Sequence, residues 1–299
     1  MNKKIVAKVV IFLLCTVNTC LAVGCTGNLG GSQLKRCDVN SVDGILRNLS
    51  QSTAELKSYR CRIEYKFSQP LLESETFRKG VLYYQRCDGK SALRINFQTL
   101  KQDDEEEQKY IEQYIFDGVW LTHIDYQIEQ VKRYQQAEAN EPVDAFDLVS
   151  QNFPIIGFSK IEDLKKQFEI NLIEQQGGEA ENFTRLYLKV KADSIYKDDY
   201  TSIDFWIDKK LDLPAKIVAV STEEDIYEIK FLKPAVNKKI SKKVFDFEVP
   251  KGFSEEIIPL KKKEQIRGVN LQNTLADCCW FVFACRLFDR WVEKRWFRK

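Results

Sequence analysis

The sequence predicts a mainly β (α+β) protein built on one long antiparallel sheet, and three observations carry this prediction. About ten or eleven segments show strand signals, and several alternate strictly between apolar and polar residues, as strands with one buried face do. Short connections favour antiparallel pairing of consecutive strands. Only three modest helical segments accompany them. The 299 residues, 44% of them hydrophobic, are enough to build a core.

The amino terminus has the layout of a secretion signal over residues 1–24. Lys3, Lys4 and Lys8 precede a clean apolar run from Val9 to Val17, and small residues follow. This run is much shorter than the roughly 20 residues that cross a bilayer, which favours cleavage over a permanent anchor. We therefore expect the mature chain in the periplasm or cell envelope of a bacterium.

Two processing routes fit the end of this signal. The segment Leu21-Ala22-Val23-Gly24-Cys25 resembles a bacterial lipobox, although Ala22 stands where that motif usually has Leu. This route predicts acylation of Cys25 and a flexible tether over residues 25–38. Ordinary cleavage after Ala22 or Gly24 would instead release a chain without lipid.

One amphipathic helix opens the main domain, which we place at residues 39–253. Apolar residues recur at helical spacing between Val39 and Leu56, and Ser41 or Asp43 is available to cap the start. Strand signals then follow, interrupted by two short helical segments at 143–153 and 161–168. The expected strands cover residues 61–67, 77–86, 93–97, 110–116, 119–124, 130–134, 168–174, 183–191, 201–207, 215–220 and 226–232.

Two connections show clear turn signals. Asp117-Gly118 lies between two apolar runs, which is a strong indication of a hairpin. The acidic run from Asp103 to Glu107 is expected to be a solvated turn, in preference to a functional acidic patch.

A meander of this length must twist and curl. Full closure would make a barrel, whereas partial closure plugged by helices would leave a concave apolar cavity. Three helical segments are too few to cover the apolar face of every strand.

Composition excludes several classes of function. The 46 basic and 44 acidic residues nearly cancel, which argues against nucleic-acid binding. His123 is the single histidine, so multi-histidine metal sites are excluded and we expect no metal or cofactor. The sequence lacks GxSxG and P-loop motifs, and carboxylates such as Asp204 and Asp208 fit the wet face of a strand. We therefore do not expect an enzyme.

Cysteines support export weakly. If Cys25 is acylated, six cysteines remain in the mature chain, an even number that could pair in an oxidising compartment. Their spacing does not define which would pair.

Several segments, in order, resemble the outer-membrane lipoprotein carrier superfamily, which contains the periplasmic lipoprotein chaperone and its outer-membrane receptor. They run across roughly residues 39–253, although Cys87 stands where the family usually has Pro and Ile95 replaces Trp. The matching segments are Gly80-Val81-Leu82-Tyr83-Tyr84-Gln85-Arg86, Leu93-Arg94-Ile95, Phe116-Asp117-Gly118-Val119-Trp120-Leu121, Gln130-Val131, residues 205–208, residues 213–217 and residues 245–252.

The resemblance implies an unclosed antiparallel β-barrel with helices covering its mouth, which agrees with the meander. It also implies that the concave apolar face binds acyl chains of lipoproteins or lipids, each buried methylene contributing about 0.8 kcal/mol. Strand parity shows which residues share a face but not which face is concave, so a filled core remains the alternative. The candidate residues are Ile63, Tyr65, Phe67, Leu82, Leu93, Ile95, Phe97, Trp120, Ile203, Phe205 and Ile207.

Arg94 matches the family's arginine beside the cavity. The resemblance implies that it influences lid closure or contacts a lipid head group. The alternative is a strand arginine in water.

Beyond a polar linker at residues 254–274, residues 275–299 show the pattern of a basic amphipathic helix. Its apolar face includes Trp280, Phe283, Leu287, Phe288 and Trp291. Three roles stay open: packing on its own domain, lying in a membrane interface, or binding a protein partner.

Two functions remain after these exclusions. The first is a periplasmic carrier or membrane-tethered acceptor of lipid or lipoprotein, which would hold acyl chains without covalent catalysis and exchange them with a lipoprotein-releasing transporter or receptor. The second is an envelope-stress sensor on the same lipid-binding scaffold, which would report to a membrane partner.

Overall fold

The computed structural model describes residues 41–87, 90–145, 161–175 and 177–260. The predicted signal, Cys25, the tether and the C-terminal aromatic helix lie outside these residues. Most of the predicted helix at 143–153 and of the linker at 254–274 lies outside them as well.

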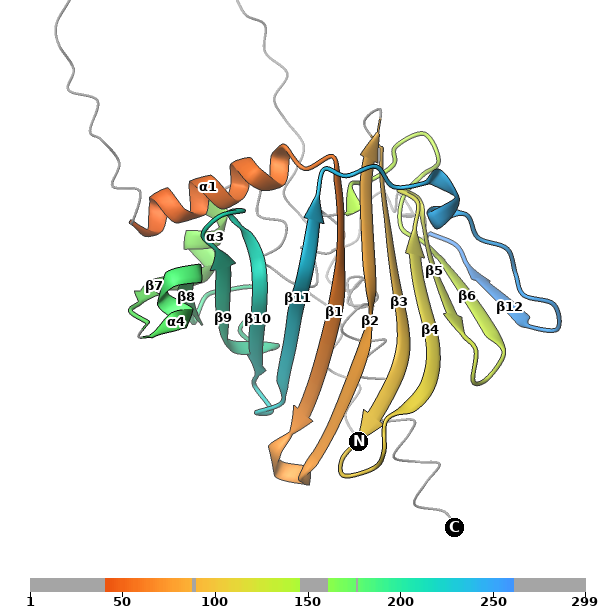
Figure 1. Ribbon diagram of the computed structural model, residues 1–299, viewed down its shortest axis with the longest axis horizontal. Helices are drawn as coiled ribbons and strands as arrows, with labels where there is room; N and C mark the ends of the chain where they lie inside the picture. The colour runs from red at the N-terminus through yellow and green to blue at the C-terminus, as the bar shows by residue number, and fades with distance from the viewer. Residues whose placement is uncertain (1–40, 88–89, 146–160, 176, 261–299) are drawn as a thin grey trace, which may run out of the picture.

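Twelve strands form one sheet that does not close on itself, which confirms the predicted fold class (Figure 1). Their order across the sheet is β12-β6-β5-β4-β3-β2-β1-β11-β10-β9-β8-β7. The strands are β1 (Ser58–Gln69), β2 (Ser74–Cys87), β3 (Lys90–Gln102), β4 (Gln108–Phe116), β5 (Trp120–Asp125), β6 (Gln130–Gln135), β7 (Phe168–Ile173), β8 (Phe183–Val190), β9 (Tyr200–Asp208), β10 (Leu213–Ser221), β11 (Ile226–Val236) and β12 (Ser254–Ile258). The described helices are α1 (Val42–Ala54), α3 (Ile161–Gln167), α4 (Gly178–Asn182) and two 3₁₀ turns, η1 (Pro70–Leu72) and η2 (Lys242–Phe245).

The strand order differs from a simple meander at two places, the pairing of β11 with β1 and the pairing of β12 with β6. β1 to β6 follow one another across part of the sheet and β7 to β11 across the rest, but β11 pairs with β1. This pairing sets Ile229 beside Tyr65 and Tyr227 beside Phe67, so apolar side chains of both strands are buried together. The sheet is therefore joined where its first and last long strands meet, and its two free edges are β12 and β7.

The sequence prediction missed β12, so the sheet has twelve strands where ten or eleven were expected. β12 is also the exception to antiparallel pairing, because it runs parallel to β6 at one edge. Four of its five residues are exposed, and it therefore shows no apolar alternation.

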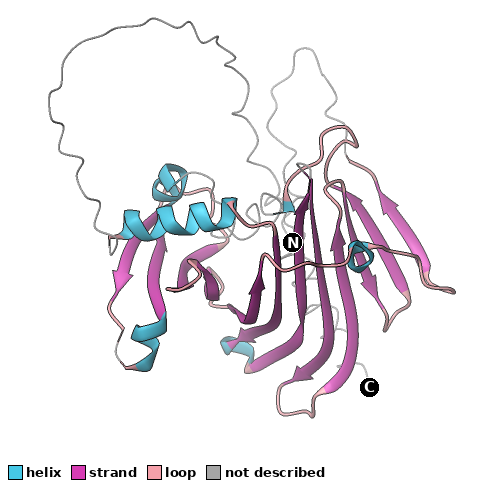
Figure 2. Cartoon of the chain, turned by 45° about the horizontal axis from the view of Figure 1, so that its top comes forward, coloured by secondary structure: helices cyan, strands magenta, loops and turns pink. Residues whose placement is uncertain are grey.

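α1 confirms the predicted opening helix. The Ser41 side chain accepts a hydrogen bond of 3.1 Å from the Gly44 amide and caps the helix. Ile45, Leu46 and Leu49 recur at helical spacing and are buried. The helix packs against α3, β7 and β10, and Figure 2 shows it lying across one end of the sheet.

Both predicted turns are confirmed. In the β4–β5 hairpin, Asp117 Oδ1 accepts hydrogen bonds from the amides of Val119 (2.9 Å) and Trp120 (2.7 Å), and Gly118 has a positive φ of 98°. Residues 103–107 form an exposed connection between β3 and β4.

β2 and β3 approach so closely at one point that only glycine fits. A Cβ on Gly80 would lie 2.2 Å from the carbonyl oxygen of Asn96, beside a register shift between Lys79 and Gly80. Gly80 therefore accommodates the bend of these two long strands.

Candidate functional site

Ten of the predicted ligand-binding residues lie on one face of the sheet, which we call the apolar face. Register shows this directly: Phe205 pairs with Ile217, Ile217 with Ile229, and Ile229 with Tyr65, so one apolar row crosses four strands. A second row joins Leu82 to Ile95. The ten residues are Ile63, Tyr65, Phe67, Leu82, Leu93, Ile95, Phe97, Ile203, Phe205 and Ile207.

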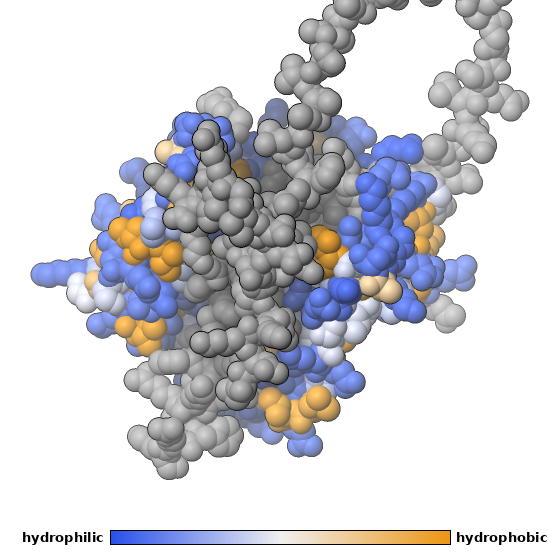
Figure 3. Space-filling view, turned by 180° about the vertical axis from the view of Figure 1, so that it is seen from behind, coloured by the Kyte–Doolittle hydropathy of each residue, from blue (hydrophilic) through white to orange (hydrophobic). Residues whose placement is uncertain are grey.

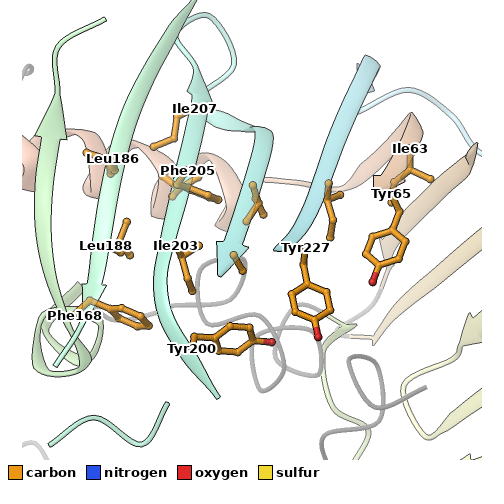
Figure 4. Packing of buried hydrophobic residues seen from close by; sticks show 14 of the residues in the cluster. Ile63, Tyr65, Phe168, Leu186, Leu188, Tyr200, Ile203, Phe205, Ile207 and Tyr227 are labelled. Carbon is orange, nitrogen blue, oxygen red and sulfur yellow. The ribbon is translucent and has the colours of Figure 1, made fainter. Parts of the chain in front are cut away.

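Nearly all of this face is buried. Exposure runs from 0% at Phe205 to 8% at Leu93, and Leu82 is half-buried. α1 contributes Ile45, Leu46 and Leu49 to the same packed cluster as β8, β9 and β10 (Figure 4). In this conformation the apolar face is a packed core, and α1 is part of its cover.

Trp120 and Arg94 lie on the opposite face, apart from the other ten. Leu93 and Leu121 occupy the apolar-face positions of β3 and β5, so their neighbours in sequence point the other way. Trp120 stacks with Arg133, whose guanidinium carbon lies 5.0 Å from the indole centroid. Trp120 was expected in the cavity, and Arg94 either beside the cavity or in water; strand parity places both on the opposite face.

Arg94 binds the segment between β11 and β12 where that segment crosses this opposite face. Its guanidinium donates to the carbonyls of Val244 (2.8 Å) and Asp246 (3.2 Å), and to the side chains of Gln113 and Asn96 (2.8 Å each). These contacts attach the segment around η2 to β3 and β4. Arg94 is therefore placed to hold this crossing segment and does not face the apolar face.

A buried charged cluster also lies on the apolar face, and the sequence analysis did not identify it. Arg78 and Glu112 are 1% and 0% exposed, and Arg78 Nη1 lies 3.2 Å from Glu112 Oε2. The Tyr114 hydroxyl donates to Glu112 Oε1 at 2.7 Å, and His123 Nε2 lies 2.8 Å from the same oxygen. The Tyr114 and His123 rings stack, with centroids 4.5 Å apart.

Strand parity could have found this cluster. Arg78 lies at even spacing from Gly80 and Leu82, and Glu112 lies at even spacing from Tyr114 and Phe116. The alternation along each strand therefore predicts that both charged side chains lie on the buried face. A buried charge needs a partner, and a complementary pair on neighbouring strands supplies it.

Electrostatics within the cluster favour the ionised carboxylate of Glu112. Burial by itself opposes ionisation, but the Arg78 guanidinium and the contacts with His123 and Tyr114 outweigh it and lower the pKa of Glu112 to about 2. Asp125, which pairs with Glu112 across β4 and β5, behaves differently: burial raises the pKa of its carboxyl, and the Glu112 charge adds to this.

Cys61, one of the six cysteines that could pair, is a free thiol and is 2% exposed. Burial raises the pKa of Cys61 to about 12, which keeps the thiol protonated and unreactive. Its role is packing beside Leu82.

Within the described ranges there is no group of three or more His, Cys, Asp or Glu side chains that could hold a metal ion. No helix among the described residues has the length and apolar character needed to cross a membrane. The coloured surface of the molecule, seen from behind, is largely hydrophilic with separate apolar patches (Figure 3).

No protein-family model matches this chain, and no curated protein matches it. Solved structures do match, at low similarity. A chain in the structure of the MucA/MucB complex of Pseudomonas aeruginosa is 13% identical with a TM-score of 0.41; the match covers 68% of this chain and 60% of that chain. A putative outer-membrane lipoprotein-sorting protein domain from Vibrio parahaemolyticus is 12% identical with a TM-score of 0.33, covering 67% of this chain and 95% of the other.

A LolA superfamily protein from Nitrosomonas europaea is 10% identical with a TM-score of 0.30, covering 69% of this chain and 97% of the other. The matched structures thus include members of the superfamily that the sequence resembles. Because the TM-scores are below 0.5, the fold assignment is based on the strand order and register described above.

Proposed function

We propose that this protein is a non-catalytic lipid-binding protein of the cell envelope, and that its apolar face accepts acyl chains. The observation that supports this most is the apolar face itself: rows of apolar side chains run across many strands of one unclosed sheet. A closed or fully layered sheet would bury such a face permanently. Here the sheet is open between its edge strands β12 and β7, and few helices accompany it in the described ranges.

Binding on this face requires the cover to move, because the side chains are buried. α1 is the described element suited to this movement. It contributes three buried residues to the cluster, and an exposed ion pair of 2.6 Å between Asp43 and Lys165 links it to α3. Such an exposed pair contributes no more than about 1 kcal/mol. Moving α1 also exposes Ile45, Leu46 and Leu49, which costs about 1.5–3 kcal/mol for each side chain. Burial of an acyl chain of ten methylenes, at about 0.8 kcal/mol each, offsets a cost of this order.

The finer roles follow from the sequence. A carrier or membrane-tethered acceptor would receive acyl chains from a lipoprotein-releasing transporter or receptor and pass them on, whereas an envelope-stress sensor would report bound lipid to a membrane protein. Two experiments separate these roles. Crosslinking in cells is expected to yield one dedicated partner for a sensor. A transfer assay is expected to show that a carrier moves acyl chains between vesicles.

The direct test is mass spectrometry of lipid that copurifies with the full chain, followed by titration with a fluorescent fatty acid. We expect acyl lipids in the extract and saturable binding of the fatty acid. An extract free of acyl lipid, together with no saturable binding, would contradict the proposal.

Neighbouring residues of β2 provide a matched pair of variants. Leu82 is half-buried on the apolar face, and Tyr83 lies on the opposite face. Leu82→Trp should lower the affinity for the fatty acid about tenfold, because the larger ring displaces roughly two methylenes of ligand. Tyr83→Trp should leave the affinity unchanged. Equal effects of both variants would place the ligand elsewhere.

A further inference from the structure

One end of the sheet is strongly acidic, and one segment at the other end is basic. Five strand connections, at residues 70–73, 103–107, 126–129, 191–199 and 222–225, lie at the same end, because alternate turns of an antiparallel sheet do so. They contain thirteen acidic residues and two basic ones. This end, at the bottom of Figure 1, is strongly negative.

The opposite end carries a segment with only positive charge. We call residues 233–243 the basic strap: it continues from the end of β11 toward η2 along the α1 side of the sheet (Figure 1). It contains Lys233, Lys238, Lys239, Lys242 and Lys243 and no acidic residue. All five lysines are exposed, and no carboxylate of the described residues forms an ion pair with them.

The backbone of the strap is fixed while its lysines are free to point outward. Asn237 donates its amide to the Ser58 carbonyl at 2.8 Å, and its side chain accepts from the Lys57 and Ser58 amides at 2.8 and 3.2 Å. The Ser58 hydroxyl donates to the Lys238 carbonyl at 2.5 Å. Beyond the strap, Arg94 holds the Val244 carbonyl. The lysines are therefore displayed as a fixed group at one end of the sheet.

We propose that the basic strap binds the surface of an anionic lipid bilayer and sets the orientation of the protein on it. Each lysine near such a surface contributes roughly 1 kcal/mol, and lysine heads act as point charges that suit a diffuse layer of head groups. The strap offers no fixed donor geometry for one small ligand.

The charge distribution favours a bilayer over an acidic peptide. A flat anionic surface can contact all five lysines of the strap at once, and its field falls off within about 10 Å at physiological salt. With the strap on the surface, the acidic turns at the other end lie beyond this field, whereas the inverted orientation would bring them into it and be repelled. The surface would hold the strands upright, with the strap and α1 toward the lipid. This inference does not depend on acyl-chain binding by the apolar face.

Vesicle sedimentation of the full chain tests the proposal. Vesicles of phosphatidylcholine with 30% phosphatidylglycerol are compared with phosphatidylcholine alone, so that apolar binding common to both cancels. We expect a preference for the anionic vesicles that weakens as salt rises. The variant K233Q/K238Q/K239Q/K242Q/K243Q should reduce this preference at least about tenfold.

A matched control removes the same charge elsewhere: K101Q/K109Q/K189Q/K197Q/K210Q changes five exposed lysines outside the strap. It should keep most of the preference. If both variants lose the preference for anionic vesicles equally, the preference depends only on net charge. If the strap variant keeps the preference, another segment binds the vesicles. Either result overturns the proposal. Binding of polyglutamate, but not of anionic vesicles, that is lost in the strap variant would overturn it in favour of an acidic partner.

The strap variant should also retain its affinity for the fluorescent fatty acid. If the wild type does not bind the fatty acid, the vesicle result still tests the strap. If the wild type does not bind anionic vesicles, the fatty-acid titration still tests the apolar face.

Discussion

Arg78 and Glu112 form an ion pair buried within a core of apolar side chains, with Arg78 Nη1 3.2 Å from Glu112 Oε2. A buried ion pair adds little stability compared with apolar residues of the same volume, but losing one partner leaves an uncompensated charge. These residues therefore constrain how β2 and β4 pack on the apolar face.

Glu112→Gln should lower the free energy of unfolding by about 3 kcal/mol, because the buried Arg78 guanidinium then loses the negative charge of the Glu112 carboxylate. Urea denaturation at pH 7 measures this loss. The double variant Arg78→Met, Glu112→Gln should recover part of it, since both charges are absent. A double variant no more stable than the single one would contradict this account.

The same pair predicts a pH dependence. The pKa of Glu112 is lowered in the folded state from the ordinary 4.5 to about 2, so its contribution is fully present above pH 4.5 and is lost as pH falls toward 2. The difference in stability between wild type and Glu112→Gln should therefore narrow over this interval. A difference that stays constant from pH 6 to pH 2.5 would show that the carboxylate is not paired in solution.

At the scale of elements, the segment between β11 and β12 shows how one side chain can hold a long crossing. Four hydrogen bonds from Arg94 join β3, β4 and the backbone beside η2. Phe247 and Phe253 then pack on Ile115, Ile124 and Val131, which form a small apolar cluster on the face opposite the apolar face. The crossing positions β12 against β6.

Arg94→Met should release this crossing. We expect faster trypsin cleavage at the lysines of residues 238–243 and a loss of about 2 kcal/mol in unfolding free energy, because hydrogen bonds from a charged group are lost. Fatty-acid affinity should not change, since Arg94 faces away from the apolar face. Arg62→Met, an exposed position on the same side of β1, is the control and should match the wild type.

At the scale of the whole molecule, the inner strands of the sheet are hydrogen-bonded on both sides and the two edge strands on one side only. β1, β2, β3 and β11 have paired neighbours on both sides, whereas β12 and β7 each have one. The five residues of β12 are nearly all exposed. Opening is therefore expected to begin at the edges.

Hydrogen exchange followed by mass spectrometry should show this gradient. Amides of β12 and β7 should exchange well before those of β1 and β2, and lipid binding should slow exchange in α1 if it covers the bound chain. Protection of β12 equal to that of β1 would mean that the edge is covered in solution.

Much of this architecture could be predicted because strand parity and turn chemistry are local. The alternation through Ile63, Tyr65 and Phe67 predicted β1 and its buried face, and Asp117-Gly118 predicted the β4–β5 hairpin. Parity would also have separated Trp120 and Arg94 from the apolar face and revealed Arg78 and Glu112. β12 could not be found this way, because an exposed, charged edge strand has no apolar period.

The sequence by itself determined the strands, their buried faces and the capped helix, since each depends on residues a few positions apart. Only the tertiary structure decided where the sheet is joined, because the pairing of β1 with β11 joins residues more than 150 positions apart and no local pattern encodes it. The same long-range pairing brings the Ser58 end of β1 beside the lysines that follow β11, and it separates them from the acidic turns by the length of the strands.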